Sequence, residues 1–148
     1  MHMQLLSRNY LPLHWMHLHA RVHLVVTKHV ADVDEWRGLL ARYSVVSCAL
    51  ERELQAGYEL GVSEYEVLER LSEMTDCSAR VQHLAGEVHL SQSALSRVIA
   101  RLEKAGLVER AMCAEDRRGI FVKLTQPGAR RQAAAEPTHR AVLAAHLH

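Results

Sequence analysis

Short hydrogen-bonding and cationic side chains recur on one face of the segment from residue 91 to residue 104. This face carries no carboxylate, and its hydroxyl, amide and guanidinium groups could bind phosphate oxygens and base edges of DNA. Arg97 or Arg101 could pair with a guanine edge, and Gln92 with an adenine. An ordinary solvent-exposed helix with a basic outer face would show the same pattern, so the segment alone does not establish DNA binding. The candidate DNA-binding side chains of this segment are Ser91, Gln92, Ser93, Ser96, Arg97, Arg101 and Lys104.

The hydrophobic pattern predicts a helix, called here the reading helix, that presents these side chains on its outer face. Ser91 can cap its start, because the hydroxyl can accept a hydrogen bond from a backbone N–H one turn on. The helix is expected to run to about Lys104 and to stop near Gly106, a residue that tolerates a left-handed exit conformation. Its buried face would consist of four apolar residues at helical spacing, Leu95, Val98, Ile99 and Leu102.

A two-stranded ribbon with arginines at its tip is predicted directly after the reading helix. Leu107 and Val108 open a short strand, and residues 120–124 read as the returning strand. Between them, EDRRG at residues 115–119 reads as a tight, charged turn. A helix followed by such a ribbon is a winged helix. The helix can enter the major groove of DNA while Arg117 and Arg118 reach an adjacent minor groove.

Two helices are predicted in the first half of the chain after residue 30. The first would be capped by Asp32 or Asp34 and would close at Gly57 after about six turns. The second would begin at Ser63, with Glu66 three residues on completing a capping box. The first helix has one amphipathic face, whose members step by alternating four and three residues: Trp36, Leu40, Tyr43, Ser47, Leu50 and Leu54.

A short third helix and a final helix flank the reading helix and the ribbon. The third helix is expected from Arg80 to about Glu87, and its short turn into the reading helix gives helix-turn-helix spacing. Arg80, at its start, is a candidate phosphate contact. Thr125 can cap the final helix, in which Pro127 fits the first turn and Pro137 would kink or restart the helix.

Several blocks of the sequence, in this order, resemble the MarR family of bacterial transcriptional regulators. They are LERELQAG, SEYEVLERLSE, VQHLAGEVHLSQSALSRVIARLEKAG and GLVER…EDRRGIFVKLTQPG, within a resemblance that covers roughly Trp36 to the C-terminus. The resemblance implies a mainly α fold with a small β-hairpin wing. The chain would then consist of a His-rich extension (1–30), which the family pattern does not explain, and a MarR-type domain (31–148). The parts of that domain would be a first dimerisation helix (31–57), a winged helix-turn-helix (63–125) and a C-terminal dimerisation helix (126–148). That last part looks shortened, because family members usually carry a further helix.

The resemblance also implies a function, which is sequence-specific binding of double-stranded DNA by a homodimeric transcriptional regulator. Most members repress from palindromic operators, and one reading helix per subunit would fall in successive major grooves about 34–36 Å apart. Many release DNA when a small aromatic or anionic effector binds. The family's Asp-x-Arg pattern matches Asp116 and Arg118, so Asp116 is expected to brace a wing arginine and Arg118 to contact the minor groove. Aromatic candidates for pocket walls are Trp36, Tyr43 and Tyr65, although aromatic side chains at helical spacing are more often part of the core.

Composition supports a globular chain with a basic C-terminal half. Hydrophobic content is 49% and charged content is 24%, and the formal net charge is +1. Residues 1–75 hold 7 Lys/Arg against 10 Asp/Glu, a balance of −3, whereas residues 76–148 hold 11 against 7, a balance of +4. The positive half contains the reading helix, as expected of a surface that meets DNA. No stretch has the length of a membrane span, and residues 1–30 do not read as a signal peptide.

Cysteine usage points to a reducing compartment, and the cytoplasm is the simplest setting. The three cysteines, Cys48, Cys77 and Cys113, are widely spaced and show no disulfide framework or metal-binding pair. Cys48 lies in an apolar stretch and is expected to be buried and inert. Cys113 enters the wing, and its expected exposure makes it the best candidate for a reactive thiol.

Two alternatives to a DNA-binding regulator of this type remain open. Residues 1–30 contain six of the eleven histidines, and His19 and His23 would share a helix face, so a metal-responsive regulator is one of them. The other is a winged helix used only for protein contacts, which would not need arginines on both the reading helix and the wing. An enzyme is not expected, because the sequence lacks a glycine-rich phosphate loop, a nucleophile elbow and a His-Glu-x-x-His pair. No cofactor is predicted.

Overall fold

The computed structural model describes residues 13–74, 76, 78–112 and 120–147, with side chains from residue 31 onward apart from that of Met112. The chain forms two compact units, Met1–Tyr43 and Ser44–His148. Its described elements are mainly helical. In chain order they are α1 (Leu13–Tyr58), α2 (Val62–Ser72), β1 (Ser78–Arg80), α3 (Val81–Glu87), α4 (Gln92–Lys104), β2 (Val108–Met112), β3 (Ile120–Leu124) and α5 (Gln126–Leu147).

The first helix is longer than the sequence analysis predicted. Asp32 and Asp34 lie inside α1, so the prediction that one of them caps a helix start is wrong. The physical reason is that no proline or glycine lies between residues 13 and 37 to end the upstream helix. The Asp34 carboxylate instead accepts a hydrogen bond from Arg37 Nη1 at 3.3 Å, one turn along the same helix. None of the described helices has the length and hydropathy needed to cross a membrane.

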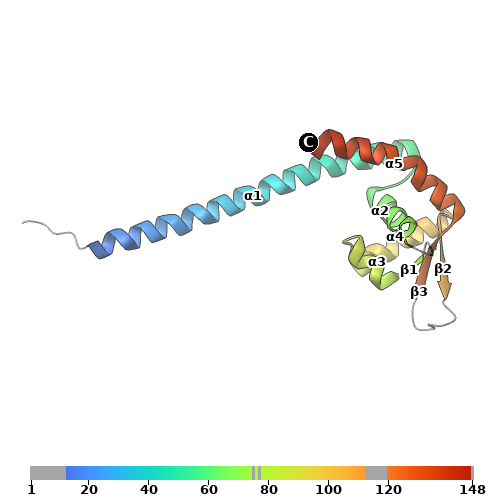
Figure 1. Cartoon of the computed structure of the whole chain (residues 1–148), viewed down its shortest axis with the longest axis horizontal. Coiled ribbons are helices and arrows are strands. Elements are labelled where there is room, and N and C mark those ends of the chain that lie inside the picture. The colour runs from blue at the N-terminus through green and yellow to red at the C-terminus, as the bar shows by residue number, and fades with distance from the viewer. Residues whose placement is uncertain (1–12, 75, 77, 113–119, 148) are drawn as a thin grey trace, which may run out of the picture. The chain divides into compact units, whose positions relative to one another are not determined.

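The second unit contains a winged helix-turn-helix, as predicted (Figure 1). Among the described residues, the strands form one antiparallel sheet in the order β1-β3-β2. β2 and β3 are the two strands of the predicted wing, and α5 follows directly from the end of β3. β1 was not predicted, because a three-residue strand shows no alternation of its own. It is held in the sheet by β3, with Arg80 opposite Phe121.

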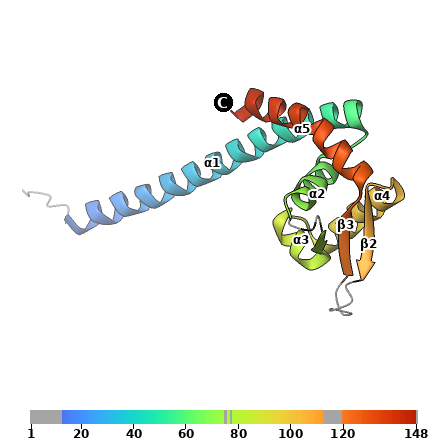
Figure 2. The ribbon, with the colours of Figure 1, turned by 45° about the vertical axis from the view of Figure 1, so that its right-hand side comes forward.

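The core of this unit forms where α2, α3 and α4 group beside the strands (Figure 2). The four apolar residues predicted for the inner face of the reading helix, Leu95, Val98, Ile99 and Leu102, are all buried. Leu68 and Leu71 from α2, Leu84 from α3 and Val122 from β3 belong to the same buried cluster. Burial of this apolar face fixes which side of α4 remains available for binding.

The start of α2 differs from the predicted capping box. The helix follows Gly61, and Glu64 Oε2 accepts a hydrogen bond from the Gly61 N–H at 2.9 Å. The prediction that Ser63 and Glu66 form the cap is therefore wrong. Ser63 lies inside the helix, and the Glu66 carboxylate lies beside His139 of α5 instead.

The join between the wing and α5 agrees with the predicted cap. Thr125 Oγ1 accepts a hydrogen bond from the Gly128 N–H at 3.1 Å and donates one to the Gly106 carbonyl at 2.7 Å. Gly106 has a φ of +71°, the left-handed exit expected after α4. Pro137 lies inside α5, which continues past it to Leu147. The first turn of α5 is thus tied to the end of the reading helix.

Candidate nucleic-acid interface

The outer face of α4 presents the side chains that the sequence analysis selected. Ser91 is the N-cap, and its Oγ accepts a hydrogen bond from the Ala94 N–H at 3.2 Å, as predicted. The cap satisfies one of the N–H groups that a helix start leaves without a partner. The predicted residues of this helix are all exposed, and they are Gln92, Ser93, Ser96, Arg97, Arg101 and Lys104.

The last turn of α4 is not free of acid. Glu103 is exposed, and its Oε2 accepts a hydrogen bond from Arg110 Nε of β2 at 3.2 Å. This ion pair joins the reading helix to the wing. The exposed groups of the first two turns, from Gln92 to Arg97, therefore form the part of the helix without a carboxylate.

Arg101 has a partner within the unit. Its Nε lies 2.6 Å from Glu64 Oε1 of α2, and the pair is separated by 37 residues of sequence. Among the described residues, Arg97 has no such ion-pair partner. Two arginines that were equivalent candidates in the sequence thus differ in the structure, because only one has a carboxylate beside it.

Arg80 lies where the helix-turn-helix meets the sheet that contains the wing strands. It is the N-cap residue of α3 and the last residue of β1. Its guanidinium carbon lies 5.6 Å from the ring centroid of Phe121 in β3, within the range of a cation–π contact. The residue is exposed, so its guanidinium could contact a phosphate from this position over the ring of the wing strand.

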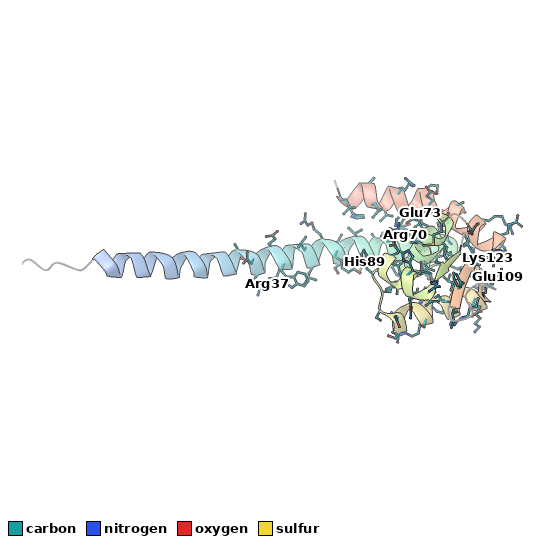
Figure 3. All side chains as sticks on the ribbon, turned by 60° about the horizontal axis from the view of Figure 1, so that its bottom comes forward. Arg37, Arg70, Glu73, His89, Glu109 and Lys123 are labelled. Atoms are coloured by element: carbon teal, nitrogen blue, oxygen red, sulfur yellow. The ribbon has the colours of Figure 1, made fainter. Side chains whose placement is uncertain are left out.

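The described part of the wing also contains a cross-strand charge pairing. Glu109 of β2 lies opposite Lys123 of β3 in the register, and the two labels lie together in Figure 3. Opposite charges at facing positions favour the pairing of two strands. The predicted tip contacts Asp116, Arg117 and Arg118 lie outside the described residues, as do the side chains of Cys77 and Cys113.

A buried contact between α2 and α5 was missed by the sequence analysis. The ring of His139 stacks on that of Tyr65 with centroids 4.3 Å apart, and His139 Nε2 lies 3.6 Å from Glu66 Oε1. The interaction with His139 lowers the pKa of the Glu66 carboxyl, and partial burial opposes this change. Burial raises the pKa of the Tyr65 hydroxyl, and its hydrogen bond to Glu69 at 2.9 Å acts in the same direction.

The aromatic residues considered as pocket walls have different positions. Tyr65 is fully buried in the core, whereas the side chains of Trp36 and Tyr43 on α1 are 59% and 71% exposed. Cys48 is exposed too, so the prediction that it is buried is wrong. Its neighbours Ala49 and Leu50 occupy the core side of α1 and leave Cys48 facing outward.

A cavity of about 510 Å³ lies where the end of α1, the end of α4 and the first turns of α5 meet. Arg131 is fixed at its edge, since Nη1 donates a hydrogen bond to the Tyr58 carbonyl at 2.7 Å and lies 3.6 Å from Glu59 Oε2. Arg130 and Leu107 also line it. The lining thus combines the cations Arg130 and Arg131 with the Glu59 carboxylate and the apolar Leu107, and guanidinium groups can bind a small organic anion. Where the structure describes side chains, no group of three His, Cys, Asp or Glu residues is placed to hold a metal ion.

Comparison with known proteins gives a consistent result. A family model described as MarR family matches residues 60–120. AbsC, a MarR family transcriptional regulator from Streptomyces coelicolor, is 37% identical over 76% of this chain and 75% of AbsC, with a TM-score of 0.71. Sco3205, a MarR family transcriptional regulator from the same organism solved in complex with DNA, is 31% identical over 73% of this chain and 68% of its own, with a TM-score of 0.70.

A third solved structure is similar to this chain in a ligand-bound form. NadR, in complex with 4-hydroxyphenylacetate, is 25% identical over 72% of this chain and 71% of NadR, with a TM-score of 0.57. No curated protein matches the chain.

Proposed function

The chain belongs to the MarR family of transcriptional regulators, and from that premise we propose that it is a homodimeric repressor of a palindromic operator. The observation that carries this proposal is the exposed outer face of α4, capped by Ser91 and joined to a wing by the Glu103–Arg110 pair. A family member 31% identical to this chain has been solved in complex with DNA. A regulator of this kind acts where the chromosome lies, which for a bacterial protein is the cytoplasm.

The proposed reading surface consists of the first two turns of α4 together with Arg80 and the wing tip. Gln92, Ser93 and Ser96 would hydrogen-bond to base edges or phosphates, and Arg97 is the candidate for a guanine. Ser91 would bind a phosphate in addition to capping the helix. Arg80 would bind a phosphate from its position over Phe121. At the wing tip, Asp116 would brace Arg118 for the minor groove, with Arg117 beside it.

A second copy of the chain is the proposed partner of α1. In the single chain, large apolar side chains of this helix are exposed at positions three and four residues apart, and such a patch on a protein surface usually marks an interface. They are Val33, Trp36, Leu39, Leu40 and Tyr43. A two-fold dimer would also explain why the operator should be palindromic, because each subunit would read one half-site.

We propose that a small organic anion releases the protein from DNA by binding in the cavity beside Arg130 and Arg131. Support comes from the lining of the cavity, which contains both cations and the apolar Leu107, and from NadR, which has been solved with 4-hydroxyphenylacetate. The cavity contacts both the end of the reading helix and α5. An occupant there would therefore favour one arrangement of the two helices over another.

Selection from a pool of random double-stranded DNA, followed by a salt series, tests the proposed function. The parent should enrich a palindrome, with affinity falling steeply as salt rises. Arg118→Ala should weaken binding by about tenfold or more, because each good groove contact contributes roughly 1–3 kcal/mol. No enrichment, or weak binding unchanged in Arg118→Ala, would contradict the proposal and favour a winged helix that binds protein.

A further inference from the structure

The ion pair between Arg101 and Glu64 has unusual surroundings for an exposed residue on a reading helix. The Arg101 side chain is 59% exposed, but the Glu64 side chain is only 14% exposed. A carboxylate so far removed from water requires a charged or hydrogen-bonding partner, and removing that partner is costly. Arg101 could contact DNA through the same Nε only by leaving this carboxylate.

Glu64 holds a second group with its other oxygen. Glu64 Oε2 accepts the hydrogen bond from the Gly61 N–H at 2.9 Å, which is one of the free N–H groups at the start of α2. The next N–H, that of Val62, donates to Glu51 Oε2 of α1 at 2.8 Å. The first N–H groups of α2 therefore donate hydrogen bonds to two carboxylates, Glu51 from α1 and Glu64 from α2 itself.

These contacts form a continuous polar path within the second unit. It runs from Glu51 on α1, through the first N–H groups of α2 and the Glu64 carboxylate, to Arg101 on α4. Its three side-chain contacts are charge-assisted hydrogen bonds of 2.8, 2.9 and 2.6 Å, and the backbone joins the two N–H groups. Arg97 is one turn closer to the start of the reading helix and is exposed without such a tie, which suits it to bind DNA directly.

We propose that Arg101 and Glu64 are positioning residues, and that they set the orientation of the reading helix against the start of α2. Arg101 then contributes to DNA affinity through the geometry of α4 and makes no phosphate contact. The proposal rests on the proposed function only in using DNA affinity as its readout. Glu51 extends the same path to α1.

A double-mutant cycle with a salt series separates this role from a DNA contact. The variants are Glu64→Gln, Arg101→Gln and the double variant, with Arg97→Gln as the matched control on the same helix. The probe is the duplex that the parent enriches from random DNA. Each member of the pair should lose affinity by about fivefold or more, and the double variant should lose no more than the worse single variant.

The salt dependence decides between the two roles. Glu64→Gln, Arg101→Gln and the double variant should keep the parent's slope of log affinity against log salt, whereas Arg97→Gln should reduce it by about 1. A slope reduced by about 1 in Arg101→Gln would overturn the proposal. An unchanged or higher DNA affinity in Glu64→Gln would overturn it too. If Arg101 contacted DNA directly, loss of the Glu64 carboxylate would free its guanidinium for that contact and would not weaken binding.

Failure of the proposed function would be visible separately, since the parent itself would then enrich no duplex. In that case the same cycle is followed by thermal unfolding. The two single variants should each lower the melting temperature, and the double variant should lower it no further. Additive losses would show that the two side chains do not act together, and would overturn the proposal.

Discussion

The contact between Glu66 and His139 joins α2 to α5 through one partly exposed and one buried titratable side chain. His139 is buried against the Tyr65 ring, and its Nε2 has no hydrogen-bond partner among the described residues. The Glu66 carboxylate lies 3.6 Å from His139 Nε2, a distance too long for a good hydrogen bond but close enough for attraction between the carboxylate and the imidazole. This attraction, and the lowered pKa of Glu66 that follows from it, make the contact sensitive to acid.

The pH dependence of folding stability should reveal this contact. Because the pKa of Glu66 is lowered in the folded state, the ionised carboxylate stabilises the fold above its ordinary pKa of 4.5. That contribution is lost as pH falls below 4.5 and through the lowered value. Glu66→Gln should be less stable than the parent at pH 7, by less than about 1 kcal/mol because Glu66 is partly exposed and solvent screens the charge. The difference should disappear at low pH.

Thermal unfolding between pH 7 and pH 3 provides the measurement. Glu73→Gln is a suitable control, because Glu73 is the C-cap of the same helix, α2, and is paired with Arg70 in an exposed salt bridge (Figure 3). A Glu66→Gln variant that stays equally destabilised at pH 3 would show that its effect comes from packing and not from charge.

At the scale of elements, the first turn of α5 packs closely against the segment between α4 and β2. A Cβ at Gly128 would lie 2.0 Å from the Leu107 carbonyl oxygen, so the first turn of α5 packs directly on the backbone that follows α4. Gly128→Ala should therefore destabilise the fold by about 2 kcal/mol or more, because backbone must move. The fall in midpoint on chemical unfolding measures this loss.

Gly86→Ala is the control for this prediction, because Gly86 lies in α3 with no atom near its missing Cβ. The substitution should stabilise by about 0.5–1 kcal/mol through helix propensity alone. If the two substitutions changed the free energy of unfolding equally, the backbone near Leu107 would have to move aside without loss of stability, which would contradict the prediction.

The elements that the sequence predicted well are those set by local rules. The reading helix has strong apolar periodicity, a serine cap and a glycine exit, and all three lie within sixteen residues of each other. The start of α2 was misplaced because its cap is a glycine without a side chain, completed by Glu64 and by Glu51 from another helix.

Site chemistry was harder to predict because its partners are distant in sequence. Nothing near Arg101 distinguishes it from Arg97, and the difference arises only when Glu64 is brought beside it. His139 likewise meets Tyr65 and Glu66 from the far end of the chain. Short-range patterns predict which side of a helix is exposed, but they do not predict which exposed charges already have partners.

At the scale of the whole molecule, the proposed dimer depends on the apolar face of α1 between residues 33 and 43. A helix with Trp36 and Leu40 exposed to water gains by burying them against a second copy, at about 25 cal/mol for each Å² of apolar surface. The double variant Trp36→Glu, Leu40→Glu would place like charges on both sides of that interface. Sedimentation should then give half the mass of the parent, with helix content largely kept.

The matched control is Ala41→Glu, Arg42→Glu, which adds the same number of acids to α1 outside the apolar face. It should keep the dimer mass. Because each half of a palindrome would be read by one subunit, the interface variant should also bind the palindrome about 100-fold or more weakly, whereas its affinity for a single half-site should equal the parent's. A monomeric variant that still binds the palindrome as tightly as the parent would contradict the proposed link between dimerisation and DNA binding. One subunit would then have to bind the whole site.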